Sequence, residues 1–252
     1  VDANRAFVFR PLHRILASLL EFGLANAKLY EQEATVPLVV VGDNQALSAA
    51  HLPVLHNGEV HRMRSAFVNM AKAWHLAKPA NNPTRTAVAA VLDRLPAGTK
   101  TAFSFGELDC RYRDGLLSHL QSNPALDPAA TIDSLVTGYL DRVQELTTAR
   151  GLTPMVVVPP AANVKQRKIA STDRALFLEI NQRYCKGLRA TAEARDIPVI
   201  DLYRATVQIQ SDDAVDSSTG SGETAERLAK DNLFIDDNHV LPSAYLAAFE
   251  GL

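Results

Sequence analysis

Residues 38–48 read LVVVGDNQALS: four apolar residues run into Gly42, and three polar residues follow. An unbroken run of Leu and Val is typical of a strand that is buried on both faces of a sheet. The carboxyl end of such a strand is where loops and helix N-termini meet in an α/β protein, so chemistry is expected there. Asn44 occupies that position, and its amide can hydrogen-bond but cannot act as a nucleophile.

Further stretches repeat this pattern of a short β-rich run followed by a helical pattern. The other expected strands are 101–105, 154–158 and 197–202, with a weaker one at 59–65. Helices are expected near 113–121, at 130–149 and from about 172 to 195. Strands that alternate with helices indicate βαβ units. We therefore predict a three-layer α/β/α sandwich around a doubly wound parallel sheet of about five strands.

The composition is that of an ordinary globular protein. The chain has 252 residues, 47% of them hydrophobic and 21% charged, and a net charge of −2. A general nucleic-acid surface is excluded because non-specific affinity for phosphates needs a basic excess. Two cysteines are too few for a disulfide framework, and free thiols are favoured over a single pair. We divide the chain into an N-terminal helical segment, 1–35, packed on a single α/β domain, 36–252.

The N-terminal segment contains HRILASLLEFGLANA, 13–27, which resembles a secretory signal in its upstream basic residues and its Ala-x-Ala end. Glu21 interrupts the apolar run, and the apolar residues follow helical spacing, so an amphipathic helix is favoured. No stretch is apolar enough to span a membrane, and a cytoplasmic location is expected. Because the chain starts at Val1 and not at Met, we expect it to be either a segment of a longer protein or a processed chain.

Three short polar clusters follow the expected strands. They are Gly42-Asp43-Asn44, FGELDCR at 105–111 and FIDDNHVLPSAY at 234–245. In this order they resemble blocks I, III and V of the SGNH (GDSL-type) hydrolase superfamily, over roughly residues 36–250. That family carries Gly-Asp-Ser after its first strand, Gly-x-Asn-Asp after a middle strand, and Asp-x-x-His near the end.

The resemblance assigns roles to residues of this chain. His239 would be the general base, and Asp236 would fix its tautomer and stabilise the imidazolium. Asn44 stands at the position of the nucleophile, and Ser48 is about 6 Å away, one turn along the helix. Either natural divergence or a deliberate replacement fits Asn44.

The oxyanion hole of the family is also altered in this sequence. Gly106 and Asp109 fit block III, whereas Leu108 replaces the Asn that donates to the oxyanion, and this second loss favours divergence. GELDCR is alternatively a subfamily's own block III, with other donors. The block II glycine has no clear equivalent; we expect that block within 65–77, with Asn69 as a substitute.

The block III region contains three charged residues at alternating positions. In an extended backbone, Glu107, Asp109 and Arg111 project to one side and, together with Asp43, form a ligand-binding rim; an internal ion pair is the alternative. Cys110 is a candidate substitute nucleophile, but it would point away from that side, and a buried thiol is favoured. His51, His56, His61 and His75 lack a zinc-binding spacing, so we predict no metal site. His75 either packs on a helix or contacts a ligand.

The resemblance implies an esterase or acyl-transfer domain for acylated carbohydrate, without metal or organic cofactor and with hydrolysis impaired at position 44. The alternative is a non-catalytic module that binds a carbohydrate or another small ligand in the same pocket. A flavodoxin-like nucleotide site fits the sheet but lacks a Gly-rich phosphate loop. Residues 208–224 are expected to be a mobile loop, either a lid or a surface insertion, and the basic run 165–168 a solvated loop.

Overall fold

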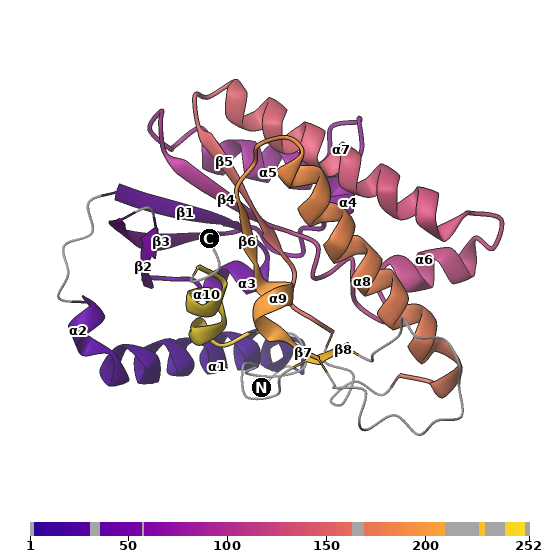
Figure 1. The fold of residues 1–252 in the computed structure, drawn as a ribbon, viewed down its shortest axis with the longest axis horizontal. Coiled ribbons are helices and arrows are strands. Elements are labelled where there is room, and N and C mark those ends of the chain that lie inside the picture. The colour runs from indigo at the N-terminus through magenta and orange to yellow at the C-terminus, as the bar shows by residue number, and fades with distance from the viewer. Residues whose placement is uncertain are drawn as a thin grey trace.

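The computed structural model describes residues 3–30, 36–56, 58–162, 169–209, 227–229 and 240–249. Within these ranges a six-stranded sheet has the order β2-β3-β1-β4-β5-β6 (Figure 1). Its strands are β1 (Val36–Gly42), β2 (Pro53–His56), β3 (Glu59–Phe67), β4 (Lys100–Ser104), β5 (Thr153–Val158) and β6 (Val199–Asp201). All neighbouring strands are parallel except β2, which pairs antiparallel with β3. The predicted parallel sheet is confirmed, with β3 longer and β6 shorter than expected.

The helices form a layer on each face of this sheet (Figure 1). One layer contains α4 (Ala73–Ala77), α5 (Pro83–Leu92), α7 (Pro128–Thr148) and α8 (Ser171–Glu193). The other contains α1 (Ala3–Ala25), α3 (Asn44–Leu47), α9 (Leu202–Thr206) and α10 (Pro242–Phe249). Short elements complete the described fold: α2 (Ala27–Tyr30), α6 (Leu116–Ser122) and the antiparallel pair β7 (Val207–Ile209) and β8 (Arg227–Ala229). The predicted three-layer α/β/α class is confirmed.

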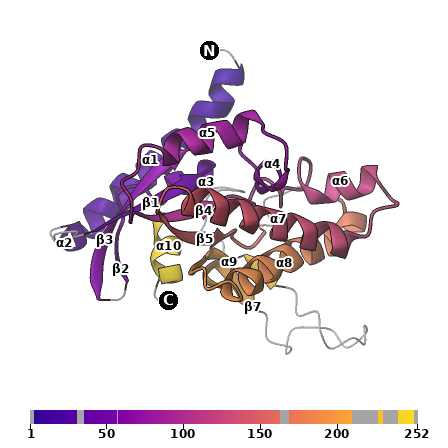
Figure 2. The same ribbon diagram turned by 90° about the horizontal axis from the view of Figure 1, so that it is seen from above.

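The apolar run of β1 is explained by its place in the middle of the sheet. β1 pairs with β3 on one side and β4 on the other, and residues 38–41 are all buried. A strand covered by a helical layer on each face can carry apolar side chains at every position. Figure 2, seen from above, shows the same sheet beneath α5 and α7.

The beginnings of two helices follow local capping signals. Asn82 accepts a hydrogen bond from the Arg85 backbone N–H at 3.1 Å and precedes Pro83, the first residue of α5. Asp127 caps α7 in the same way, again with a proline next. A side-chain acceptor at the N-cap and a proline at the first helical position both favour a helix start.

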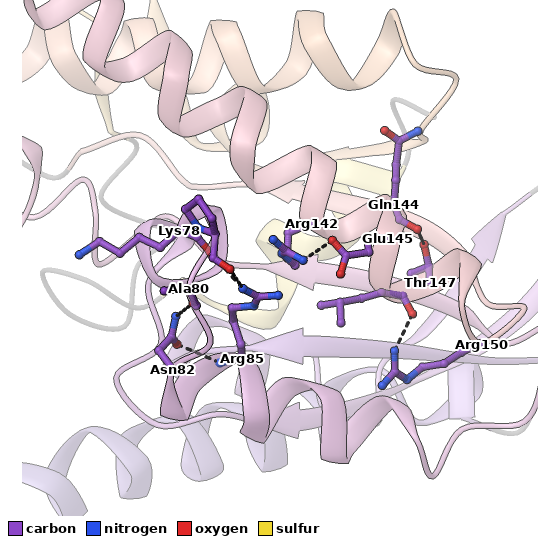
Figure 3. A network of polar contacts seen from close by, with 11 residues as sticks. Lys78, Ala80, Asn82, Arg85, Arg142, Gln144, Glu145, Thr147 and Arg150 are labelled. Carbon is purple, nitrogen blue, oxygen red and sulfur yellow. Dashed lines mark hydrogen bonds and ion pairs between the residues drawn. The ribbon is translucent and has the colours of Figure 1, made fainter.

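The turn between α4 and α5 is held by side chains of its own segment (Figure 3). The Arg85 guanidinium donates to the carbonyl oxygens of Lys78, at 3.2 Å, and of Pro79. The Asn82 amide donates to the carbonyl oxygens of His75, at 2.8 Å, and of Ala80, at 3.3 Å. These contacts fix the C-terminal end of the short helix α4 against α5.

The N-terminal helix α1 lies against α10, and its apolar residues divide into two rows. Ile15 is fully buried, and Leu19 and Phe22 pack against the core. Leu20, by contrast, is 64% exposed, and Leu16 and Leu24 are exposed as well. The predicted amphipathic helix therefore buries only one of its two rows of apolar side chains. Among the described helices, none is both long and apolar enough to cross a membrane.

Candidate functional site

The strand order has a switch point at the carboxyl ends of β1 and β4. From β1 the chain moves to β3 on one side and then returns to β4 on the other, so the strand order reverses between β1 and β4. Ligands of open α/β sheets bind at such a switch point. Gly42 at the end of β1 is in register with Ser104 of β4 and with Phe67 of β3. The loops that follow these three strands therefore emerge side by side.

The block I residues form a tight passage from strand to helix. A Cβ atom on Gly42 would lie 2.8 Å from the Ser104 Cβ, so a side chain at this position would collide with β4. Asp43 is the N-cap of α3, and its Oδ1 accepts a hydrogen bond from the Gln45 N–H at 3.0 Å. Asn44 is the first residue of α3 and is half-buried. The expected position of Asn44 at a helix N-terminus is thus observed.

The carboxyl group of Asp43 is 2% exposed, and its Oδ2 makes no hydrogen bond within the described part of the chain. Burial, followed by the charge of nearby Glu107, raises the pKa of Asp43 well above its ordinary value. These surroundings favour the protonated form of the carboxyl group, and its contact with the Gln45 N–H supports the block I turn.

The block III residues form a compact turn, so the expected extended backbone at 107–111 is wrong. The Cys110 N–H donates to the carbonyl oxygens of Gly106 and Glu107, both at 3.0 Å. Gly106 has a φ of +120°, and a Cβ there would lie 2.5 Å from the Tyr184 hydroxyl. Because the chain turns at Gly106, side chains four residues apart share a face.

Glu107 and Arg111 are those side chains, and they form an internal ion pair. The Arg111 Nε lies 2.8 Å and its Nη2 2.7 Å from Glu107 Oε2, in a fork-shaped contact. Glu107 is buried and Arg111 is partly buried. Of the two alternatives left open by the sequence, the ion pair that holds the loop is present.

Asp109 points to a different element from Glu107 and Arg111. Its carboxylate accepts hydrogen bonds from the backbone N–H groups of Ala73, at 2.8 Å, and Trp74, at 3.1 Å, at the start of α4. Burial raises the pKa of Asp109 to about 6. The three charged residues therefore do not form one rim: two pair with each other, and Asp109 caps α4.

Cys110 is buried and free, as is Cys185 of α8. Contact with the Cys185 thiol and burial raise the pKa of Cys110 well above its ordinary value. The attacking form of a cysteine is the thiolate, which these surroundings disfavour. Cys110 is thus not an activated substitute for the missing serine.

The loop after β3 lies at the same edge of the sheet, where the block II residues were expected. The Val68 N–H donates to the Gly42 carbonyl oxygen at 2.7 Å, so this loop begins beside block I. Asn69 is exposed. Met70 has a φ of +54°, a conformation that glycine adopts with least cost. Met70 is thus the position in this loop where a glycine would relieve backbone strain.

Asp236 and His239 lie outside the described residues, as do 210–224 of the expected mobile loop and the basic run 165–168. The first two residues of that expected loop, 208–209, belong to strand β7 instead. The next residue after His239 is described, however. The Val240 N–H donates to Gln45 Oε1 at 3.3 Å, and the Tyr245 hydroxyl donates to the Gln45 carbonyl oxygen at 3.1 Å. Sequence reasoning missed Gln45 and Tyr245, because no local pattern indicates that they meet.

Within the described ranges, no group of three or more His, Cys, Asp and Glu side chains could hold a metal ion. The groups that the structure describes at this edge include hydrogen-bonding side chains, a buried ion pair and buried carboxyl groups. The half-buried Asn44 amide stands beside them at the start of α3.

No family model matches the chain, and no curated protein matches it. Among solved structures, it is similar to a carbohydrate acetylesterase from Sinorhizobium meliloti, with 12% identity and a TM-score of 0.47 over 86% of this chain and 96% of that chain. A G-D-S-L family lipolytic protein from Veillonella parvula has 12% identity and a TM-score of 0.44 over 86% and 95%. An aryl esterase from M. smegmatis has 12% identity and a TM-score of 0.44 over 86% and 96%. Each of these likenesses is one of overall fold.

Proposed function

We propose that the carboxyl edge of β1 and β4 is an SGNH-type site for acylated carbohydrate, in which Asn44 takes the place of the nucleophile. The observation that carries the proposal is the hydrogen bond between Val240 N–H and Gln45 Oε1. Val240, the residue that follows His239 in the sequence, thus contacts the residue that follows Asn44, and this contact supports the proposal.

In this site His239 is the base, and Asp236 holds its ring in the orientation that leaves the other nitrogen free to accept a proton. Acyl transfer also requires a hydroxyl or thiol beside the base. Asn44 offers neither, and the Ser48 hydroxyl is fully buried. The chain as it stands therefore holds an acyl ester without attacking it through a serine.

A second candidate function is a binding module that never uses the base. The half-buried Asn44 amide at the start of α3 favours this candidate, because it offers a donor and an acceptor to a polar ligand. The buried carboxyl groups of Asp43 and Asp109 and the Glu107–Arg111 pair then serve only to hold the loops in place. The two candidates differ in whether restoring a hydroxyl restores turnover.

The first prediction concerns Asn44→Ser. The variant places a hydroxyl beside His239, and we expect hydrolysis of para-nitrophenyl acetate on the order of 10²-fold or more above the parent chain, the lower range for a positioned general base. An activated ester is the appropriate probe, because a good leaving group reduces the demand on an oxyanion hole that has Leu108 in place of an Asn. The release of nitrophenolate measures the rate.

The control is Asn44→Ser combined with His239→Ala, which should return hydrolysis to the level of the parent. If Asn44→Ser keeps the parent's circular dichroism and shows no His239-dependent turnover, the site has lost more than its nucleophile and the binding module is the better account. If the parent already hydrolyses the ester and Asn44→Ala leaves the rate unchanged, the reactive position has been assigned wrongly.

A cytoplasmic location and membership of a longer chain also stay proposals. They are tested together by cell fractionation and by the mass of the protein that an antibody against α8 detects in its source. A detected mass equal to that of the 252 residues would contradict the longer chain.

A further inference from the structure

A cavity of about 310 Å³ lies between the start of α4 and one face of α6, on the outer side of the block III turn. Lys72, Trp74 and His75 line it from α4, and Asp109 and Asp114 from the turn. Its volume is at the lower end of the range for small-molecule sites. Because Asp109 belongs both to this wall and to the turn beside Asn44, the cavity adjoins the proposed ester site.

The α6 helix contributes both apolar and polar side chains to the cavity wall. Its leucines at 116, 117 and 120 are buried, and Ser118, His119 and Ser122 line the cavity together with Leu116. Neither of the two serine hydroxyls makes a hydrogen bond to any residue that the structure describes. The cavity wall therefore carries two hydroxyl groups with spare donors and acceptors.

Two aromatic rings stand at one side of the cavity. The rings of Trp74 and His119 have centroids 5.1 Å apart and planes inclined at 54°, so they diverge instead of stacking flat. The Lys78 ammonium lies 5.2 Å from the centre of the Trp74 ring. Asp109 holds the first turn of this helix, and the contacts of Asn82 and Arg85 hold its end (Figure 3). The Trp74 ring is thus carried by a helix that is fixed at both ends.

Further polar groups in the wall have defined hydrogen-bonding roles. Burial, and then the charges of Lys72 and Lys78, lower the pKa of His75, which keeps its ring neutral. Its Nδ1 accepts from the Lys72 N–H at 3.3 Å, so the proton is assigned to Nε2, which can donate. The exposed Asp114 carboxylate is an acceptor. The Lys72 ammonium already donates to the Asp114 carbonyl oxygen.

We propose that this cavity binds one neutral pyranose ring of a carbohydrate. Such a ring has a C–H face that packs on an aromatic side chain and hydroxyl groups that need both donors and acceptors. The Trp74 and His119 rings that line the cavity supply the first, and Ser118, Ser122 and Asp114 supply the second. An anionic ligand fits less well, because the exposed Asp114 carboxylate is negative and the Lys72 ammonium already donates to the Asp114 carbonyl oxygen. The assignment rests on the proposed function for its link to the acyl group, which the neighbouring site would hold.

Trp74 is the single tryptophan of the chain, so its fluorescence reports on this cavity alone. We expect cellobiose, xylobiose or chitobiose to change the Trp74 emission saturably, with a Kd on the order of 1–10 mM, as suits a ring that makes few contacts. Replacing Ser118 and Ser122 together by alanine should weaken that binding at least about fivefold, since each hydroxyl contributes one or more hydrogen bonds. Ser134→Ala, at an exposed serine of α7 outside the cavity, is the matched control and should bind as the parent does.

The absence of a saturable change with all three disaccharides would overturn the proposal, as would a change that adenosine produces and the disaccharides do not. A sugar response that Asn44→Ala abolishes and the double serine variant keeps would place the sugar at the β1 edge, again overturning it. The outcome does not depend on catalysis. Sugar binding at Trp74 together with an inactive Asn44→Ser variant would mean that only the proposed hydrolytic site has failed.

Discussion

At the scale of single residues, the most unusual group is the carboxyl of Asp43. It is buried, close to Glu107, and has a pKa well above its ordinary value. In the unfolded chain the group ionises near pH 3.8, whereas the folded protein keeps its proton to a higher pH. Between the unfolded and the folded pKa of Asp43, the protein takes up a proton when it folds. The stability that the neutral carboxyl group supplies is therefore lost as the pH rises through this range.

The second prediction follows from that linkage. Relative to Asp43→Asn, which keeps an acceptor for the Gln45 N–H and cannot ionise, the parent should have constant stability below about pH 4. Above pH 4 its free energy of unfolding should fall by up to about 1.4 kcal/mol per pH unit, until the pH reaches the pKa of Asp43 in the folded protein. Urea unfolding of both chains from pH 4 to 8 measures the difference. A stability difference that stays flat over this range would show that Asp43 is ionised in the folded protein.

Individual site residues were predictable where the reason was local. The unbroken Leu and Val run of β1 located Asn44, because a strand buried on both faces must end in a loop at the sheet edge. The alternating charges at 107–111 suggested an extended backbone, and that prediction was wrong. The φ of +120° at Gly106 turns the chain, so Glu107 and Arg111, four residues apart, come together. Gln45 had no local signal, since its partner Val240 is 195 positions away.

At the scale of elements, helix starts differ in where their caps come from. The α5 and α7 helices begin at Asn or Asp followed by proline, which a sequence pattern detects. The α4 helix follows Lys72, whose side chain makes no capping hydrogen bond; Asp109, 36 positions later, accepts from its Ala73 N–H instead. Such a cap cannot be seen in the sequence of α4 itself, and it ties this helix to the block III turn.

The third prediction compares two caps. Asp109→Ala leaves two N–H groups of α4 without an acceptor, one of them buried, and should lower the free energy of unfolding by about 2 kcal/mol. Asp127→Ala removes an exposed cap of α7, with a cost of about 1 kcal/mol. Urea denaturation at pH 7 gives both values, and circular dichroism confirms that each variant folds. Equal costs would contradict the view that Asp109 does more than an ordinary exposed cap.

At the scale of the whole molecule, the sequence predicted the alternation that builds the parallel sheet but not how the sheet closes. The α10 helix contacts both β2 and β6, the two edge strands, so the sheet curls around it. Tyr245 of this helix is fully buried, and its hydroxyl donates to the Gln45 carbonyl oxygen and lies 3.4 Å from Ser104 Oγ. These contacts join the last helix to the loops of the first and fourth strands. Long-range pairs of this kind leave no periodic pattern in the sequence.

The fourth prediction tests whether the Tyr245 hydroxyl stabilises the contact between α10 and the Asn44 turn. Tyr245→Phe removes one buried hydroxyl and leaves the Gln45 carbonyl oxygen without it, so we expect a stability loss of about 1–1.5 kcal/mol. Tyr139→Phe is the matched control, because the buried Tyr139 hydroxyl of α7 donates to the Phe103 carbonyl oxygen at 3.2 Å on the other face of the sheet.

Hydrogen exchange read by mass spectrometry should then separate the two variants, since a region opens more often when a hydrogen bond that holds it is removed. Tyr245→Phe should speed exchange in 240–249 and 44–48, and Tyr139→Phe should speed it in 128–148. If Tyr245→Phe leaves the exchange of 44–48 unchanged, α10 is not what holds the Asn44 turn in place, and the proposed role of His239 loses the contact that supports it.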